Sequence, residues 1–308
     1  MEGLTGYTYR NAHNAYFNNI DKYFSPFISA NKSKGLRNRE LNDILPENNQ
    51  GLVLIPQILT DSADDFIHTA KKLKLFGYEE VNLNLGCPSG TVVSKGKGAG
   101  FLAKPRELDK FLEQIFSQSV TKISVKTRIG MDDPEEFHDL IKIFNKYPIE
   151  ELIIHPRIRK DFYKNKPNLI IFKDAVSMSK NPVCYNGDIF TLKDYEKFSS
   201  DFPGVGSVML GRGLLTNPGL VKTIKSSIKT DKNLLKEFHD RIYSDNKEIL
   251  FGNVSVLNRM KELWFYMISI FSDNEKYAKK IKKATKLHDY EEAVSRLFRE
   301  QNILENYK

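Results

Sequence analysis

Cys87 lies between a strand-like segment and a glycine-rich loop, where its thiol could donate a proton. Residues 79–101 read EEVNLNLGCPSGTVVSKGKGAGF, and aliphatic side chains alternate there with Asn82 and Asn84, which is the period of a strand with one amide face. Glycine and proline at 86–88 then end the strand. A thiol with a pKa near 8.5 is mostly protonated at neutral pH and still acidic enough to act as a general acid. An isolated cysteine is more often an inert buried side chain, but the amides and the pliable loop favour a functional one.

Polar side chains also end the other predicted strands. Each has an ordinary structural explanation, such as a lysine that extends to solvent or a histidine satisfied in the core. Together, however, they would all need partners at one end of a sheet, and a lysine placed there requires an anion. A cofactor with a phosphate would satisfy both needs. The residues are Gln57, Asn84, Lys126, Arg128, His155, Arg157, Asn186, Asp188, Gly211 and Arg212.

The spacing of the glycines favours a mononucleotide such as FMN. Barrels often bind phosphate at the loops after their last two strands, where Gly187, Gly211 and Gly213 let backbone N–H groups approach and Arg212 adds charge. The sequence GKGAG matches neither the dinucleotide-binding pattern nor the P-loop pattern.

The elements that must position these residues alternate along the chain, which predicts a parallel sheet of the (β/α)8 TIM-barrel class. We expect the first of the eight strands to precede Met1. Active sites of such barrels lie at the carboxyl ends of the strands. The predicted strands are 24–29, 52–59, 81–85, 123–128, 152–155, 182–186 and 207–210, and the predicted helices are 62–76, 105–119, 134–146, 168–179 and 191–199.

From about residue 231 the alternation stops and a small bundle of helices is expected, at 233–243, 254–271, 275–287 and 291–304. We therefore predict a barrel domain at 1–230 and a helical domain at 231–308. Six lysines between Lys276 and Lys286 could be simply a solvated face. Arg259, Lys261 and Trp264 on one helix fit either a nucleic-acid contact or an ordinary amphipathic helix.

Composition limits the class of protein. The chain has 308 residues, of which 40% are hydrophobic and 28% charged, as in ordinary globular proteins. Two cysteines are too few for a disulfide scaffold or a four-ligand metal site, so no metal is expected. No membrane span or secretion signal is evident, and we expect a monomer in the cytoplasm. The net charge of +8 permits a polyanionic partner.

The chain resembles the dihydrouridine synthases, FMN-dependent enzymes that reduce uridine in RNA. The resemblance spans the barrel and is weak in the helical tail. Pro156 and Ile158 replace the glycine and threonine of the family's His-Gly-Arg-Thr-Arg motif, and the family's Ala-Pro before Met-Glu-Gly is absent. The motifs that carry it are MEGLTGYTYR at 1–10, NLNLGCPSG at 82–90, VKTRIG at 125–130, HPRIR at 155–159, NGDI at 186–189 and LGRGLLTNP at 210–218.

The resemblance implies a set of roles. Asn84 would hold the uracil, Cys87 would protonate it opposite the flavin, NADPH would supply the electrons, and tRNA would be the partner. Residues 231–308 would form an RNA-binding domain, and Arg128, Arg157 and Arg159 would contact the substrate. From its place just beyond the strand at 152–155, we expect the basic run of Arg157, Arg159, Lys160, Lys164 and Lys166 to bind phosphates of the RNA. The residues implied to surround FMN are Met1, Glu2, Gly3, Gln57, Lys126, His155, Asn186, Asp188, Gly211 and Arg212.

Three readings remain open from the residues. The first is a flavin-dependent reductase of uridine in RNA, whose target must leave the helical stack to react. The second is an FMN barrel that acts on a free small molecule. The third is an RNA-binding relative that has lost catalysis.

Overall fold

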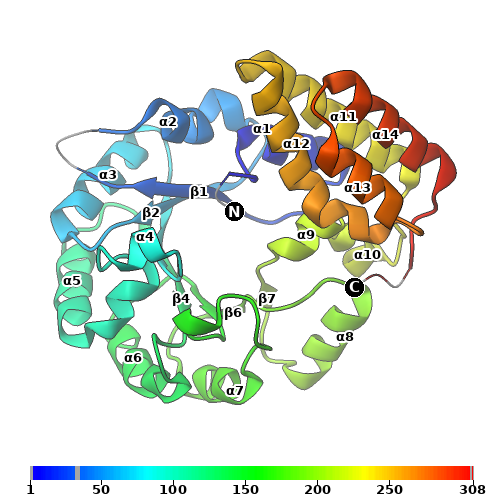
Figure 1. Cartoon of the computed structure of the whole chain (residues 1–308). Helices are drawn as coiled ribbons and strands as arrows, with labels where there is room; N and C mark the ends of the chain where they lie inside the picture. The colour runs from blue at the N-terminus through cyan, green and yellow to red at the C-terminus, as the bar shows by residue number, and fades with distance from the viewer. Residues whose placement is uncertain (1–2, 32–34, 306, 308) are drawn as a thin grey trace. The chain divides into compact units, whose positions relative to one another are not determined.

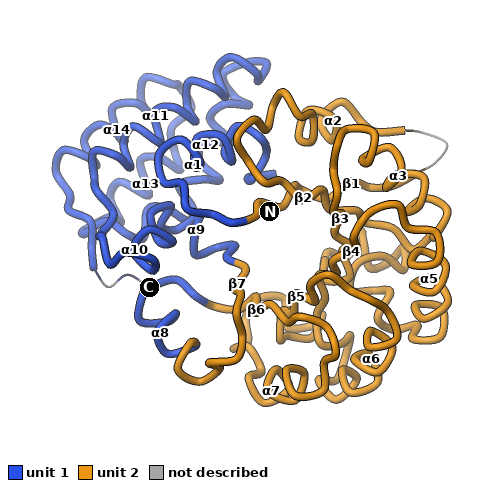
Figure 2. The backbone as a smooth tube through the Cα atoms, turned by 180° about the vertical axis from the view of Figure 1, so that it is seen from behind, with its two compact units in different colours: residues 1–21, 189–198, 210–308 blue, residues 22–188, 199–209 orange. Residues whose placement is uncertain are grey.

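The computed structural model describes residues 3–31, 35–305 and 307 and divides the chain into two compact units. Unit 1 comprises residues 1–21, 189–198 and 210–308, and unit 2 comprises residues 22–188 and 199–209 (Figure 2). The predicted cofactor contacts Met1 and Glu2 lie outside the described residues. The domain boundary at 230 stays a prediction, because unit 1 contains residues from both sides of it.

Unit 2 contains a parallel sheet whose seven described strands follow one another in chain order. Figure 1 shows them passing from β1 in blue to β7 in green around a curled sheet, with α5, α6 and α7 on its outer face. The seven predicted strands are therefore confirmed, each to within two residues. Their bounds are β1 Tyr23–Ser29, β2 Leu54–Leu59, β3 Glu80–Leu85, β4 Lys122–Arg128, β5 Leu152–His155, β6 Val183–Tyr185 and β7 Ser207–Val208.

The helices around the sheet form where apolar residues recur at helical spacing. In α5, for example, Leu108, Phe111, Leu112 and Ile115 are buried on one side, and Pro105 starts the helix where it needs no N–H donor. The sequence analysis missed the two short helices α2 and α4. The helices of this unit are α2 Asn38–Ile44, α3 Ala63–Leu75, α4 Gly90–Val93, α5 Pro105–Ser117, α6 Phe137–Phe144 and α7 Leu169–Met178, with 3-10 turns η1 Pro46–Asn49, η2 Gly98–Ala103, η3 Pro134–Glu136 and η4 Arg159–Asp161.

Unit 1 is helical and has its own hydrophobic core. The predicted C-terminal helices are confirmed, and the core also contains Tyr9, Ala12 and Phe17 from the N-terminal segment. No described helix is both long and apolar enough to cross a bilayer. The helices are α1 Tyr7–Tyr16, α8 Leu192–Asp201, whose last turn belongs to unit 2, α9 Arg212–Thr216, α10 Leu220–Ser226, α11 Lys232–Ile249, α12 Asn253–Met267, α13 Glu275–Lys283 and α14 Leu287–Glu300, with η5 Ile268–Ile270.

The amphipathic reading of α12 accounts for its contacts. Trp264 is buried and its Nε1 donates to the hydroxyl of Tyr290 at 2.8 Å. Lys261 Nζ donates to the carbonyl of Ala284 at 2.5 Å, and Arg259 lies 3.8 Å from Glu262. All three side chains of the predicted nucleic-acid pattern are thus engaged within the bundle.

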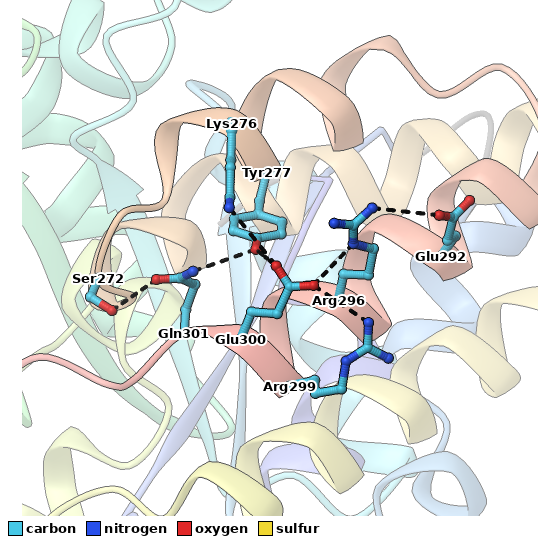
Figure 3. A network of polar contacts seen from close by, with 8 residues as sticks. All are labelled: Ser272, Lys276, Tyr277, Glu292, Arg296, Arg299, Glu300 and Gln301. Carbon is cyan, nitrogen blue, oxygen red and sulfur yellow. Dashed lines mark hydrogen bonds and ion pairs between the residues drawn. The ribbon is translucent and has the colours of Figure 1, made fainter.

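Helix α13 is fixed to α14 by a polar network that includes Lys276, whose Nζ lies 3.8 Å from Glu300 Oε2 (Figure 3). The buried Tyr277 donates its hydroxyl to Glu300, which also accepts from Arg296 Nε at 3.1 Å and Arg299 NH2 at 3.4 Å. The Tyr277 hydrogen bond, followed by that of Arg296, lowers the pKa of Glu300 to about 2. Gln301 Nε2 lies 3.4 Å from the same hydroxyl, so the end of α14 is held from two sides.

A buried histidine in α1 makes the stability of this unit pH-dependent. His13 Nε2 donates to the carbonyl of Pro218 at 2.9 Å, and burial lowers the pKa of His13 to about 4. In the unfolded chain His13 binds a proton below about pH 6.5, whereas in the folded chain it does so only below about pH 4. The free energy of unfolding therefore falls as the pH falls through this window. We expect wild type to lose about 2 kcal/mol from this group between pH 7 and 5. Urea unfolding at both pH values tests this against His13→Gln, which keeps a donor and does not titrate, and an equal loss in that variant would contradict it.

Candidate active site

A chain of amide hydrogen bonds crosses the inner face of the sheet. Gln57 Nε2 on β2 donates to Asn82 Oδ1 on β3 at 2.8 Å, and Asn82 Nδ2 donates to Ser124 Oγ on β4 at 3.0 Å. Asn84 Nδ2 donates to Gln57 Oε1 at 2.6 Å. All four side chains are buried, so each lost hydrogen bond would leave an unpaired polar group inside the protein. The chain of amides therefore fixes the side chains at this end of three strands.

Asn84 also shapes the turn that presents Cys87. Its Oδ1 accepts the backbone N–H groups of Gly86 and Cys87, both at 3.0 Å. Its oxygen is therefore occupied. Nδ2 donates one N–H to Gln57, and its other N–H has no partner among the described residues and could donate to a ligand. The predicted contact of Asn84 with uracil stays a prediction, and its hold on the Cys87 turn is observed.

The loop after Cys87 is folded rather than irregular. It contains α4 and the 3-10 turn η2, in which residues 98–102 are buried. Gly98 has φ +57, and a Cβ there would lie 2.9 Å from the backbone oxygen of Cys87. The N–H of Ala99 donates to that same oxygen at 3.1 Å. A glycine is therefore required at 98 to let the loop close against Cys87, whose side chain is partly exposed.

Lys126 points inward from β4 beside Asn84, its register partner on β3. Burial, and next the positive charge of Arg128, lower the pKa of Lys126 to about 8. Across residues 3–31, 35–305 and 307, no hydrogen-bond acceptor or carboxylate pairs with its Nζ. The ammonium group of Lys126 is thus held in a position where a bound anion would stabilise it.

Arg128, two residues further along β4, binds backbone carbonyls. Its Nε donates to Gly86 at 3.0 Å, its NH1 to Ile158 at 2.8 Å and its NH2 to Phe162 at 2.8 Å. The residue is 1% exposed. Direct contact of Arg128 with a substrate stays a prediction, whereas its link between the Cys87 turn and the loop after β5 is observed.

His155, Arg157 and Asp188 form one cluster at the ends of β5 and β6. Arg157 donates from NH1 to Asp188 Oδ1 at 3.1 Å and from NH2 to Oδ2, and its NH1 lies 3.0 Å from His155 Nε2. A guanidinium group can only donate, so His155 Nε2 accepts and the ring proton of the neutral histidine lies on Nδ1. Arg157 is 1% exposed. Its predicted phosphate contact also stays a prediction.

The remaining predicted residues are placed as follows. Asn186 Nδ2 donates to the carbonyl of Met209 at 2.7 Å in unit 2. In unit 1, Gly211 precedes α9, the guanidinium of Arg212 lies 5.4 Å from the ring centroid of Phe190, and Gly3 has φ +81. In unit 2, Arg159 begins the 3-10 turn η4, and its guanidinium lies 5.3 Å from the ring centroid of Phe162.

The sequence analysis located the strand-end residues but missed two neighbours. Asn82 connects Gln57 to Ser124, and its alternation with Asn84 could have indicated that role. The ring centroid of Tyr163 lies 5.9 Å from that of His155. The only sequence signal for this neighbour was the pair Phe162-Tyr163 between Lys160 and Lys164.

The chain is similar to proteins of one family. The chain matches the family model described as "Dihydrouridine synthase (Dus)" over residues 1–308. It is 28% identical over 181 residues to tRNA-dihydrouridine synthase B of Pasteurella multocida (strain Pm70), covering 58% of this chain and 54% of that protein. It is 29% identical over 171 residues to "Probable tRNA-dihydrouridine synthase" of Staphylococcus aureus (strain N315), covering 54% and 51%. The chain spans about half the length of these curated relatives.

Solved structures show the fold. A variant of NCR from Zymomonas mobilis superposes with a TM-score of 0.52 at 13% identity, covering 76% of this chain and 85% of that one. The old yellow enzyme homologue NCR from the same organism gives 0.51 at 12% identity, covering 77% and 88%. The predicted barrel class is confirmed.

Proposed function

This chain belongs to the dihydrouridine synthase family, and from that premise we propose that it reduces specific uridines in tRNA to 5,6-dihydrouridine, with FMN as resident cofactor and NADPH as electron source. The names of the curated relatives support the tRNA substrate. The observation that carries the proposal is Lys126, a cation on the inner face of the sheet with no partner among the described residues and a pKa lowered to about 8.

The residues of unit 2 fit a flavin. Lys126 supplies a positive charge, Gln57 and Asn84 supply amides, and Arg157 fixes the position of the His155 ring. These groups come from neighbouring strands and share the inner face of the sheet. We propose that Gln57, Lys126, His155 and Asn186 hold the cofactor, with Asp188 positioning His155 through Arg157. The contacts of Gly3, Gly211 and Arg212 with the cofactor remain part of the same proposal.

The chemistry divides between cofactor and protein. When bound, reduced FMN supplies the hydride that one carbon of the uracil C5–C6 bond must receive. Cys87 donates the proton to the other carbon: its S–H bond breaks, a C–H bond forms, and the thiolate regains a proton from solvent. Asn84 and Gly98 hold the Cys87 turn in place. The positive charge of Lys126 would stabilise the negative charge of the reduced cofactor.

The uridine must leave the helical stack before its ring can approach this site. The surface beside His155 and Arg157 carries Lys160, Lys164 and Lys166, which would attract the phosphates of a tRNA.

The purified full-length chain tests this proposal directly. We expect it to be yellow, with absorption near about 450 nm from the flavin itself, and to form dihydrouridine in unmodified tRNA when NADPH is added, as measured by nucleoside mass spectrometry. Reduction of free uracil but not of tRNA would instead identify a small-molecule reductase. A colourless protein that cannot be reconstituted with FMN would contradict the cofactor assignment.

A further inference from the structure

The loop between β5 and α7 is built on two buried arginines. Arg128 binds the carbonyls of Ile158 and Phe162, each at 2.8 Å, and Arg157 Nε binds that of Asn165. The loop backbone is therefore fixed to the same residues that contact the Cys87 turn and His155.

Further hydrogen bonds fix the loop internally. The carboxylate of Asp161 accepts the backbone N–H of Ile158 at 3.0 Å and the side-chain N–H of Asn165. Arg159 N donates to the carbonyl of Gly130 at 2.9 Å. Phe162 has φ +48 and ψ −97, a conformation that costs energy in a residue with a side chain. Phe162 is held in this conformation by Arg128, which donates to its carbonyl, and by its own N–H, which donates to the carbonyl of Arg159.

The strain presents aromatic rings at the surface instead of burying them. Phe162 is 39% exposed, and the guanidinium of Arg159 lies 5.3 Å from its ring centroid. Tyr163 is 47% exposed, and its ring lies 5.6 Å from the guanidinium of Arg128 as well as beside His155. Two adjacent aromatic side chains thus extend from the candidate active site to solvent.

The same loop carries uncompensated positive charge. Lys160 pairs with Asp132 at 2.8 Å. Lys164 and Lys166 are exposed, and no carboxylate in the part of the chain that the structure describes pairs with either of them. Free cations next to exposed aromatic rings are the combination that binds single-stranded nucleic acid, because phosphates meet the charges and unpaired bases stack on the rings. Bases inside an RNA helix are not available for such stacking.

We propose that residues 158–166 form a preorganised binding surface for an unpaired stretch of RNA, with the ring of Phe162 stacking on a base and Lys164 and Lys166 binding phosphates. This inference rests on the proposed function and adds to it a specific contact beside the reacting uridine. Because the loop is already fixed, binding costs little ordering of the protein. An acidic protein surface would also neutralise the lysines, and competition with polyglutamate distinguishes such a partner from RNA.

Binding of a short unstructured RNA that carries 2-aminopurine tests the surface on the flavin-loaded full chain. We expect Phe162→Leu to weaken binding about tenfold and to abolish the quenching of the 2-aminopurine fluorescence that stacking causes. Phe162→Trp should bind at least as tightly as wild type. The matched control is Phe251→Leu, which removes a ring that is 99% exposed in unit 1 and should change nothing.

The charge contribution is measured separately. The double variant Lys164→Gln, Lys166→Gln should lower the slope of log affinity against log salt by about 1.4 and leave the quenching at saturation intact. The inference would be overturned if binding and quenching were unchanged in Phe162→Leu, or if Phe251→Leu lost as much binding. It would also be overturned if polyglutamate displaced the RNA equally from wild type and from Phe162→Leu. Dihydrouridine formation by wild type, measured alongside, reports the proposed function on its own, so failure of either is recognised independently.

Discussion

Replacing Cys87 with alanine is expected to lower the rate of dihydrouridine formation in tRNA by about 10²–10⁴-fold, because the uracil ring then lacks its proton donor. Reduction of the bound flavin by NADPH should be unchanged, since the thiol takes no part in that step. The measurement pairs single-turnover mass spectrometry of tRNA with anaerobic stopped-flow absorption of the flavin.

Cys184→Ala is the matched control. That thiol is buried on β6, and burial raises its pKa to about 12, so it cannot serve as an acid at neutral pH. Full tRNA turnover by Cys87→Ala, or an equal loss in Cys184→Ala, would refute the acid role of Cys87.

Replacing Lys126 with methionine is expected to slow flavin reduction by about 10²-fold, because the substitution keeps an unbranched side chain one atom shorter and removes the charge that stabilises the reduced cofactor. Lys122→Met is the control on the same strand: its ammonium is exposed and lies 2.8 Å from Glu150. A rate in Lys126→Met equal to that of the control would show that the charge is not needed.

The pKa of Lys126 adds a pH dependence with a definite sign. The group is protonated below about pH 8 in the free protein, and a bound anion favours the protonated form. The affinity for FMN should therefore fall by up to about tenfold per pH unit as the pH rises above 8, until the pKa of the complex is reached. Titrations of the apoprotein with FMN at pH 7, 8 and 9 measure this fall, and the slope should disappear in Lys126→Met. A slope that persists there would mean that another group is responsible.

Local sequence was sufficient to predict the strands and most helices. The alternation at Val81–Leu85 and the glycine and proline that follow act over a few residues, so the strand and the Cys87 turn could be read from neighbouring positions. By the same two-residue period Lys126 and Arg128 share one face of β4, and the register pairs them with Asn84 and His155. Helix α1 was not predicted, because its buried side can be recognised only when its partners in the helical core are known.

The sequence by itself determined which residue types reach the carboxyl ends of the strands, because side-chain direction in a strand depends only on position along it. Only the tertiary structure decided what each of them does there. Arg128 binds carbonyls that lie 30 and 34 residues further along the chain, and Arg157 joins His155 to Asp188. Burial requires such partners, because the N–H groups of a guanidinium inside the protein cost free energy unless they are hydrogen-bonded. No local sequence pattern reveals which acceptors the fold brings close to them.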